Sequence, residues 1–228
     1  MTVTELGCMG VKPGLNIMDE STPEGEIFMG VYKKINAAPG APHRIYLGLQ
    51  SDDPSRVWGF FDWDSIEDHV NFAKTFGGEA VKDLPKVLTH GEFSKHIAAT
   101  PSLPEALRSH PTDVFTLYFP SDISAAEKDA TAKQLQHILE HSFGNNPEVK
   151  ATSYGWEVGN NPAMTEQKGP EADCFIMAFV GWSNIEAYKK ACGTEAYIEA
   201  VRSIKGIKAS LRAVNFQLSC HVLDKKTE

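Results

Sequence analysis

The chain has 228 residues, of which 42% are hydrophobic and 23% charged, proportions that are ordinary for a globular protein with its own core. Its net charge of -8, without any long run of Lys or Arg, argues against nucleic acid as a partner. No apolar run reaches membrane-spanning length and the first residues do not follow a signal-peptide pattern, so the sequence predicts a cytoplasmic protein with no membrane partner.

The first half of the chain has the pattern strand, helix, strand, strand, helix, strand. A strand is predicted at 3–11, and a helix begins at Thr22-Pro23, where proline suits the first helical position. Residues 45–50 and 56–62 are predicted to form a hairpin, and a capped helix follows it. The fourth strand of this half is predicted at 86–97.

The second half repeats that order. Ser124-x-x-Glu127 predicts a capped helix that runs to about residue 141. A long polar turn is expected at 160–170. The four strands of this half are predicted at 113–119, 149–158, 174–182 and 211–223.

Two segments of the chain are similar to each other. VWGFFDWDSIEDHVNF, at 57–72, and IMAFVGWSNIEAYKKA, at 176–191, share Phe, Trp, Ile and Glu at constant spacing. Asp64-x-x-Glu67 and Ser183-x-x-Glu186 both have the spacing of a capping box, which predicts a helix start in each. The matched pairs are Phe60 and Phe179, Trp63 and Trp182, Ile66 and Ile185, and Glu67 and Glu186.

This repeat predicts a tandem α+β fold built from two ferredoxin-like βαββαβ units. The N-terminal half is expected at 1–100 and the C-terminal half at 113–228, joined by a proline-rich linker at 101–112. The antiparallel sheets of the two halves are expected to form one intramolecular α+β barrel.

The pattern of a strand ending in Trp, a capped helix and a last strand carrying His resembles the dimeric α+β barrel superfamily. The antibiotic-biosynthesis-monooxygenase-like and stress-responsive members are the most similar, and here two copies in one chain would form the barrel that two subunits form elsewhere. This resemblance implies a fold that carries cofactor-free monooxygenases, polyketide cyclases, muconolactone isomerases and haem enzymes. Fold alone therefore selects no reaction.

The two fourth strands carry alternating polar side chains. Helices cover one face of each sheet, so that face is expected to be apolar and the polar row to line the barrel interior as a ligand cavity. The alternatives are that these groups pair with one another or with water, or that the strand ends are exposed. The polar row consists of His90, Glu92, Ser94 and His96 in the first half, and Asn215, Gln217, Ser219 and His221 in the second.

His90 and Glu92 are the predicted catalytic pair. They lie two residues apart on one strand, so their side chains would flank one ligand at about 7 Å from each other. We expect His90 to act as general acid or base and Glu92 to orient it or transfer a second proton. Substrate-binding roles are predicted for His96, Asn215, Gln217, His221, Tyr46 and Trp58, with Asn215 and Gln217 donating to a developing oxyanion.

These residues predict an enzyme without metal or other cofactor that acts on a small aromatic or polyketide-like molecule by acid–base chemistry. The reaction would be that of a cyclase, a lyase or dehydratase, or a monooxygenase, and a homodimer is one assembly the sequence allows. One alternative is a haem-binding barrel with His90, His96 or His221 as axial ligand. The other is a noncatalytic small-molecule-binding or stress protein.

Other candidate sites carry less weight. His137 and His141 match an HxxEH zinc motif, but Leu135, Ile138 and Leu139 define the opposite, core-facing side of that helix. The four cysteines contain no CxxC pair. His69 is interpreted as a partly buried helix residue, and Trp63 and Trp182 as core anchors.

Overall fold

The computed structural model describes residues 2–159, 174–208 and 210–225, and these form two compact units. The first unit contains the described residues up to 98, together with 158–159 and 220–225. The second contains 99–157 and the described residues from 174 to 219. The turn expected at 160–170 lies outside the described residues.

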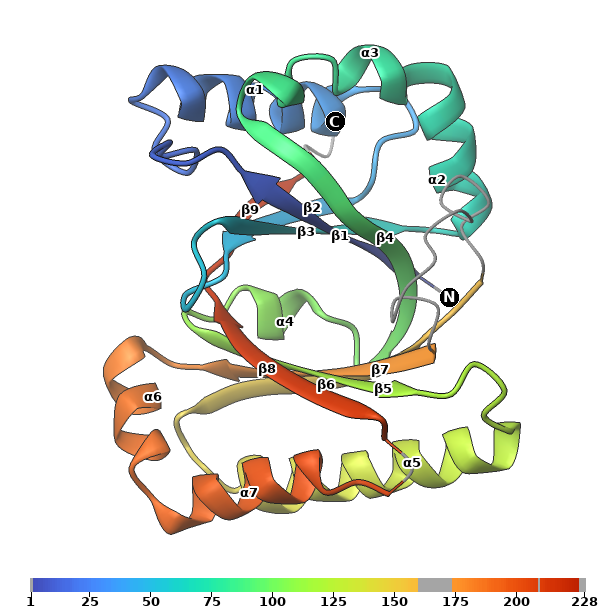
Figure 1. Cartoon of the computed structure of the whole chain (residues 1–228), viewed down its shortest axis with the longest axis vertical. Helices are drawn as coiled ribbons and strands as arrows, with labels where there is room; N and C mark the ends of the chain where they lie inside the picture. Colours follow the sequence, from blue (N-terminus) through green and yellow to red (C-terminus); the bar gives the residue numbers. More distant parts are fainter. Residues whose placement is uncertain (1, 160–173, 209, 226–228) are drawn as a thin grey trace. The chain divides into compact units, whose positions relative to one another are not determined.

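The first unit contains an antiparallel sheet in the order β4-β1-β3-β2-β9 (Figure 1). The order β4-β1-β3-β2 is that of a ferredoxin-like βαββαβ unit, and the short strand β9 pairs with the outer edge of β2. The strands are β1 (Val3–Val11), β2 (Arg44–Leu49), β3 (Arg56–Trp63), β4 (Leu88–Thr100) and β9 (His221–Asp224).

Helices cover one face of this sheet, as Figure 1 shows, and the apolar core of the unit lies between helices and sheet. The helix after β1 begins as expected, because Thr22 accepts a hydrogen bond from the Gly25 amide and Pro23 occupies the first helical position. The helical segments are α1 (Pro23–Ala37), α2 (Ile66–Phe72), the π turn η1 (Ala73–Gly77), α3 (Gly78–Ala80) and the 3-10 turn η2 (Leu84–Lys86).

The second unit repeats the arrangement, with the antiparallel strand order β8-β5-β7-β6. Helices α5 and α7 cover one face of its sheet, and the short helix α4 lies on the other (Figure 1). The strands are β5 (Thr112–Phe119), β6 (Val149–Glu157), β7 (Cys174–Trp182) and β8 (Arg212–Leu218). The helices are α4 (Pro104–Leu107), α5 (Ala125–Ile138) with the π turn η3 (Leu139–Phe143), α6 (Ile185–Cys192) and α7 (Glu195–Lys205).

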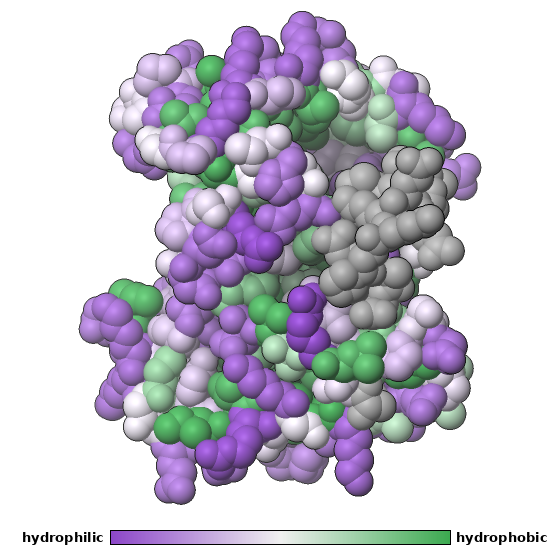
Figure 2. Space-filling model, viewed as in Figure 1, coloured by the Kyte–Doolittle hydropathy of each residue, from purple (hydrophilic) through white to green (hydrophobic). Residues whose placement is uncertain are grey.

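The predicted α+β fold with two ferredoxin-like repeats is therefore confirmed. Hydrophilic side chains cover most of the helical surface of each unit in Figure 2, and the apolar residues are mainly held between helices and sheet. No helix in the described part of the chain is both long and apolar enough to cross a membrane. Closure of the two sheets into one barrel stays a prediction.

The helix caps differ from the prediction at two of three places. Ser124 forms the expected capping box with Glu127. The caps expected at Asp64 and Ser183 were wrong by one residue, because Ser65 accepts from the Asp68 amide and Asn184 from the Ala187 amide. Serine and asparagine are strong N-cap residues, so the same local rule is satisfied one position later.

The last strand of the second half is shorter than predicted. It was expected to run through residue 223, but β8 ends at Leu218, which pairs with Thr112 at the start of β5. Beyond Leu218, strand β5 offers no further residue for pairing. The chain continues as β9 on the edge of β2, so His221 belongs to the first unit and not to the row of Asn215 and Gln217.

Candidate functional site

A cavity of about 420 Å³ lies between the sheet and the helices of the first unit. This volume is within the range of about 300–1,000 Å³ that small-molecule sites occupy. Its polar side chains include Glu5, His69 and Ser94, and the rest of its lining is mainly apolar. Aromatic and aliphatic walls come from Tyr32, Phe61, Trp63, Phe72, Val81 and Leu84.

Glu5 is the polar centre of this cavity. Trp63 Nε1 donates a hydrogen bond to Glu5 Oε2 at 3.1 Å, and Ser94 Oγ donates to Oε1 at 3.3 Å. Burial raises the pKa of Glu5 to about 7, even though these two hydrogen bonds favour the ionised form. Near neutral pH the carboxyl is thus poised to take or give a proton.

Two histidines extend the polar contacts of Glu5 toward the protein interior. His69 Nε2 lies 3.3 Å from Glu5 Oε2, and His69 Nδ1 lies 2.9 Å from His96 Nε2. His96 is 1% exposed, and the His69 ring stacks on Trp63 at 5.2 Å between centroids. Burial lowers the pKa of His69 to about 4, and burial together with the nearby His69 lowers the pKa of His96 to about 4. Both rings are therefore neutral at pH 7.

The sheet register brings these groups together. Glu5 pairs with Phe61 across β1 and β3, and with His96 across β1 and β4. Trp63 lies two residues beyond Phe61, so it shares the helix-facing side of the sheet. The Ser65 cap then starts α2, which carries His69 back over the end of the sheet to meet Glu5.

The side chains of Glu5, His69 and His96 form a hydrogen-bonded network with two self-consistent protonation states. When Glu5 is protonated, it donates to Nε2 of His69, and Nδ1–H of His69 donates to His96 Nε2. When Glu5 is ionised, His69 carries its proton on Nε2 and accepts from His96 Nε2–H. The site can therefore hold or release one proton while both imidazoles stay neutral.

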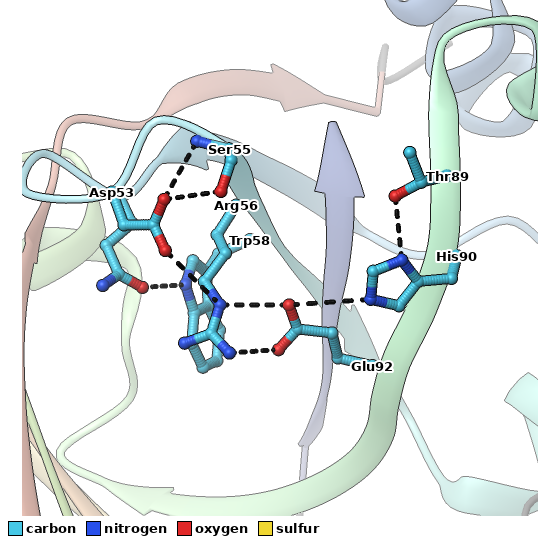
Figure 3. Close-up of polar contacts among 8 residues, drawn as sticks. Asp53, Ser55, Arg56, Trp58, Thr89, His90 and Glu92 are labelled. Atoms are coloured by element: carbon cyan, nitrogen blue, oxygen red, sulfur yellow. Dashed lines mark hydrogen bonds and ion pairs between the residues drawn. The ribbon is translucent and has the colours of Figure 1, made fainter. Parts of the chain in front are cut away.

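The structure places the predicted catalytic pair elsewhere on β4 (Figure 3). Glu92 forms a two-point ion pair with Arg56, with Nε to Oε1 at 3.0 Å and Nη2 to Oε2 at 2.7 Å. His90 Nε2 lies 4.0 Å from Glu92 Oε1, and His90 Nδ1 lies 2.8 Å from Thr89 Oγ1. The His90 side chain is 62% exposed, and the cavity that Glu5 lines does not include this pair. The catalytic role of His90 and Glu92 stays a prediction.

A bulge in β4 explains why the polar row divides. Cys8 pairs with Phe93, but the adjacent Met9 pairs with Gly91, so Glu92 is an extra residue in β4. Ser94 and His96 contact Glu5 and His69 on the helix-facing side. Glu92 reaches Arg56, which has the strand parity of the opposite side.

The expectation that the whole polar row faces away from the helices is wrong for Ser94 and His96 in the first half and for Gln217 in the second, whereas Glu92 does lie on the side away from the helices. His96 contacts His69 of α2, and Gln217 Nε2 donates to the hydroxyl of Tyr188 on α6. Asn215 shares the face of Gln217 by strand alternation. These polar groups tolerate the helix-covered face because side chains from the helices satisfy their hydrogen bonds.

The remaining predicted substrate-binding residues lie outside the cavity lining. Trp58 is buried, donates from Nε1 to Gln50 Oε1 at 3.2 Å, and stacks with Phe60. Tyr46 is buried and pairs with Val222 in register, whereas His221 on β9 is exposed. The structure thus brings Tyr46 and Trp58 to neighbouring strands and assigns Asn215 and Gln217 to the second unit. Their binding roles stay predictions.

Glu5 is the candidate functional residue that the sequence did not predict. It is the one charged residue of the strand Val3–Val11, and a charge inside a buried strand was a usable signal. His69 is partly buried, as expected, but its contacts with Glu5 and His96 could not be read from its own helix.

The described histidines do not fit a haem in this cavity. The cavity lining contains none of the three proposed axial ligands, and both nitrogens of its own histidine, His69, lie against Glu5 and His96. Within the described residues, no group of three or more His, Cys, Asp or Glu side chains is arranged to hold a metal ion. His137 and His141 are exposed, with ring centroids 3.9 Å apart.

No protein-family model and no curated protein sequence matches the chain. Several solved structures match it in fold. An anthrone oxidase-like protein matches with a TM-score of 0.66 at 14% identity, over 99% of this chain and 94% of its own. A proposed monooxygenase from Fusobacterium nucleatum matches with 0.61 at 11% identity, over 98% and 94%. A protein described as a proposed chlorite dismutase matches with 0.56 at 11% identity, over 96% and 94%.

At these identities the likeness concerns the fold, and it spans nearly the whole of both chains in each case. Each of the two units described above has the same ferredoxin-like strand order. The chain therefore has the fold of these solved structures, with two ferredoxin-like repeats in one polypeptide.

Proposed function

We propose that the protein is an enzyme that moves protons on a small aromatic or polyketide-like molecule held in the cavity of the first unit. The observation that carries the proposal is Glu5, a carboxyl with its pKa raised to about 7 in a mostly apolar cavity and joined to two neutral histidines. A general base works best when its pKa is near the working pH. The structural neighbours, which include an anthrone oxidase-like protein and a proposed monooxygenase, support chemistry of this class.

In this proposal the ionised Glu5 takes a proton from an acidic C–H or O–H bond of the substrate. The hydrogen bonds from Trp63 and Ser94 hold the carboxyl in place, and His69 changes tautomer as Glu5 becomes protonated. The apolar walls exclude water, which keeps the pKa of Glu5 high. The substrate anion would then cyclise, eliminate a leaving group or react with dioxygen, as in a cyclase, a lyase or a cofactor-independent monooxygenase.

His90 and Glu92 remain a second candidate pair for the same chemistry. Two features favour Glu5 over them: Glu92 is held by Arg56, and the His90 side chain is largely exposed. Substitutions that remove one carboxylate each, Glu5→Gln and Glu92→Gln, separate the two sites because they make the same chemical change on neighbouring strands.

The test uses anthrone as the probe and measures oxygen uptake, quinone formation and exchange of the acidic C–H with deuterium from solvent. Loss of a general base lowers the rate by about 10²–10⁴-fold, so Glu5→Gln should do this while Glu92→Gln stays near wild type. The reverse result would move the chemistry to His90 and Glu92. Binding of the probe to wild type without exchange or uptake would instead support a noncatalytic binding protein.

A further inference from the structure

The second unit carries a counterpart of the Glu5 site. Asp113 on β5 pairs with Val180, two residues before Trp182, just as Glu5 pairs with Phe61, two residues before Trp63. Trp182 Nε1 donates to Asp113 Oδ2 at 3.2 Å, and Trp63 Nε1 donates to Glu5 Oε2 at 3.1 Å. The carboxylate and its indole donor thus occupy equivalent positions in both repeats.

The other two members of the cluster also correspond. Asp113 pairs across the sheet with Gln217, as Glu5 pairs with His96. Tyr188 follows Trp182 at the spacing at which His69 follows Trp63, and it contacts Gln217 through its hydroxyl. The first repeat therefore has Glu, Trp, His and His where the second has Asp, Trp, Tyr and Gln.

The two repeats differ in what lies against the carboxylate. In the second unit, Tyr197 of α7 donates its hydroxyl to Asp113 Oδ2 at 2.9 Å. Its ring contacts Phe143, Trp182 and Tyr188, each at 6.1 Å between centroids. In the first unit, the segment after α2 instead lines the cavity with Gly77, Gly78 and Val81. Tyr197 follows Trp182 at the spacing at which Gly78 follows Trp63, so one repeat has a phenol at the position where the other has a glycine.

The phenol of Tyr197 is a hydrogen-bond donor to a buried carboxyl. Asp113 is fully buried, and burial raises its pKa to about 6, against the hydrogen bonds from Tyr197 and Trp182. Burial and the nearby Asp113 raise the pKa of Tyr197, so its hydroxyl stays protonated and able to donate. Loss of that hydroxyl would leave a buried carboxylate with fewer donors.

We infer that the second unit holds a closed copy of the first unit's site, in which the Tyr197 side chain is a built-in phenol ligand of Asp113. Removal of that side chain opens a binding site for a small free phenol. The chemical class follows from the contacts, namely an aromatic ring among three aromatic side chains and one O–H donor to the carboxylate. This inference concerns Asp113 and does not depend on activity at Glu5.

The test is Tyr197→Ala with p-cresol, which is the tyrosine side chain as a free molecule. The indole N–H signals of Trp63 and Trp182, observed by ¹⁵N NMR, report the two sites separately. We expect p-cresol to shift the Trp182 signal in Tyr197→Ala and to leave it unmoved in wild type and in Tyr197→Phe, where the ring still fills the site. Toluene should bind the variant about tenfold more weakly, because it lacks the O–H donor.

An unmoved Trp182 signal in folded Tyr197→Ala would overturn the inference, and so would equal shifts in wild type. If Tyr197→Ala does not fold alone, it is refolded with p-cresol or with toluene, and p-cresol should recover more folded protein. Equal recovery with the two compounds would count against the inference as well. A shift of the Trp63 signal alone reports binding at Glu5 and would mean that the second unit has no such site.

Discussion

Glu5 and His96 are direct cross-strand partners on β1 and β4, and His69 links their side chains. One ring nitrogen of His69 lies 3.3 Å from the carboxyl of Glu5, and the other lies 2.9 Å from His96 Nε2. The tautomer of His69 is consequently tied to the protonation of Glu5. This coupling distinguishes the site from an isolated buried carboxyl and gives the stability of the protein a defined pH dependence.

The first prediction concerns Glu5→Gln. The pKa of Glu5 is raised from 4.5 to about 7 in the folded state, so the folded state binds this proton more tightly than the unfolded chain. The resulting stabilisation is complete below pH 4.5 and is lost as the pH rises through 7. Between pH 4.5 and 9, Glu5→Gln should therefore gain about 3 kcal/mol of unfolding free energy relative to wild type. Urea unfolding at each pH measures this gain, and parallel curves for the two proteins would contradict it.

The second prediction concerns His96→Gln, which installs the residue that the second repeat has at the matching position. Burial lowers the pKa of His96 from 6.5 to about 4. Its contribution to stability is present above pH 6.5 and is lost as the pH falls through 4. The variant should fold. When the pH is lowered across this window, its unfolding free energy should fall by up to about 3 kcal/mol less than that of wild type. Denaturant unfolding at pH 7, 5 and 4 measures it, and an unchanged acid dependence would show that His96 does not titrate as described.

The fold was largely predictable because its signals are local. The strands at 3–11 and 174–182 were predicted with the bounds the structure shows, since their apolar and β-branched residues are bordered by clear turns. The repeat of Trp63 as Trp182 identified the architecture. Local rules also fixed the helix starts to within one residue.

The site was less predictable because it depends on long-range register. Glu5 and His96 come together only through the pairing of β1 with β4, which no short motif encodes. The alternation rule also failed across the bulge at Glu92, so a row that looks continuous in the sequence is divided between two faces. Alternation likewise did not predict that helix side chains such as His69 would supply hydrogen-bond partners for a polar row on the covered face.

The third prediction compares three Trp→Phe substitutions. Trp63 donates to the half-buried carboxyl of Glu5 and Trp182 to the buried carboxyl of Asp113, whereas Trp156 donates to the backbone carbonyl of Lys128. A hydrogen bond to a charged group contributes about 1.5–3 kcal/mol and a neutral one about 0.5–1.5 kcal/mol, so the first two variants should lose more stability at pH 8 than Trp156→Phe. Trp63→Phe should also raise the pKa of Glu5, because the indole favours the ionised form. Equal losses of unfolding free energy in all three variants would show that the hydrogen bonds to the carboxyls contribute no more than the one to the backbone carbonyl.

The last prediction fills the cavity of the first unit. Gly78 lines the cavity in a helical conformation, and a Cβ added there would meet no atom within 4 Å. Gly78→Leu should therefore project its side chain into open space, remove the glycine penalty of about 0.5–1 kcal/mol, and keep or raise the melting temperature. It should weaken binding of a hydrophobic probe such as anthrone by at least about tenfold, because it takes up volume the ligand needs.

Gly30→Leu is the matched control, since Gly30 is also helical with no atom within 4 Å of an added Cβ, and it does not line the cavity. Fluorescence titration and thermal unfolding of both variants give the comparison. Equal probe affinity in Gly78→Leu and Gly30→Leu would mean that the ligand binds elsewhere than beside Glu5.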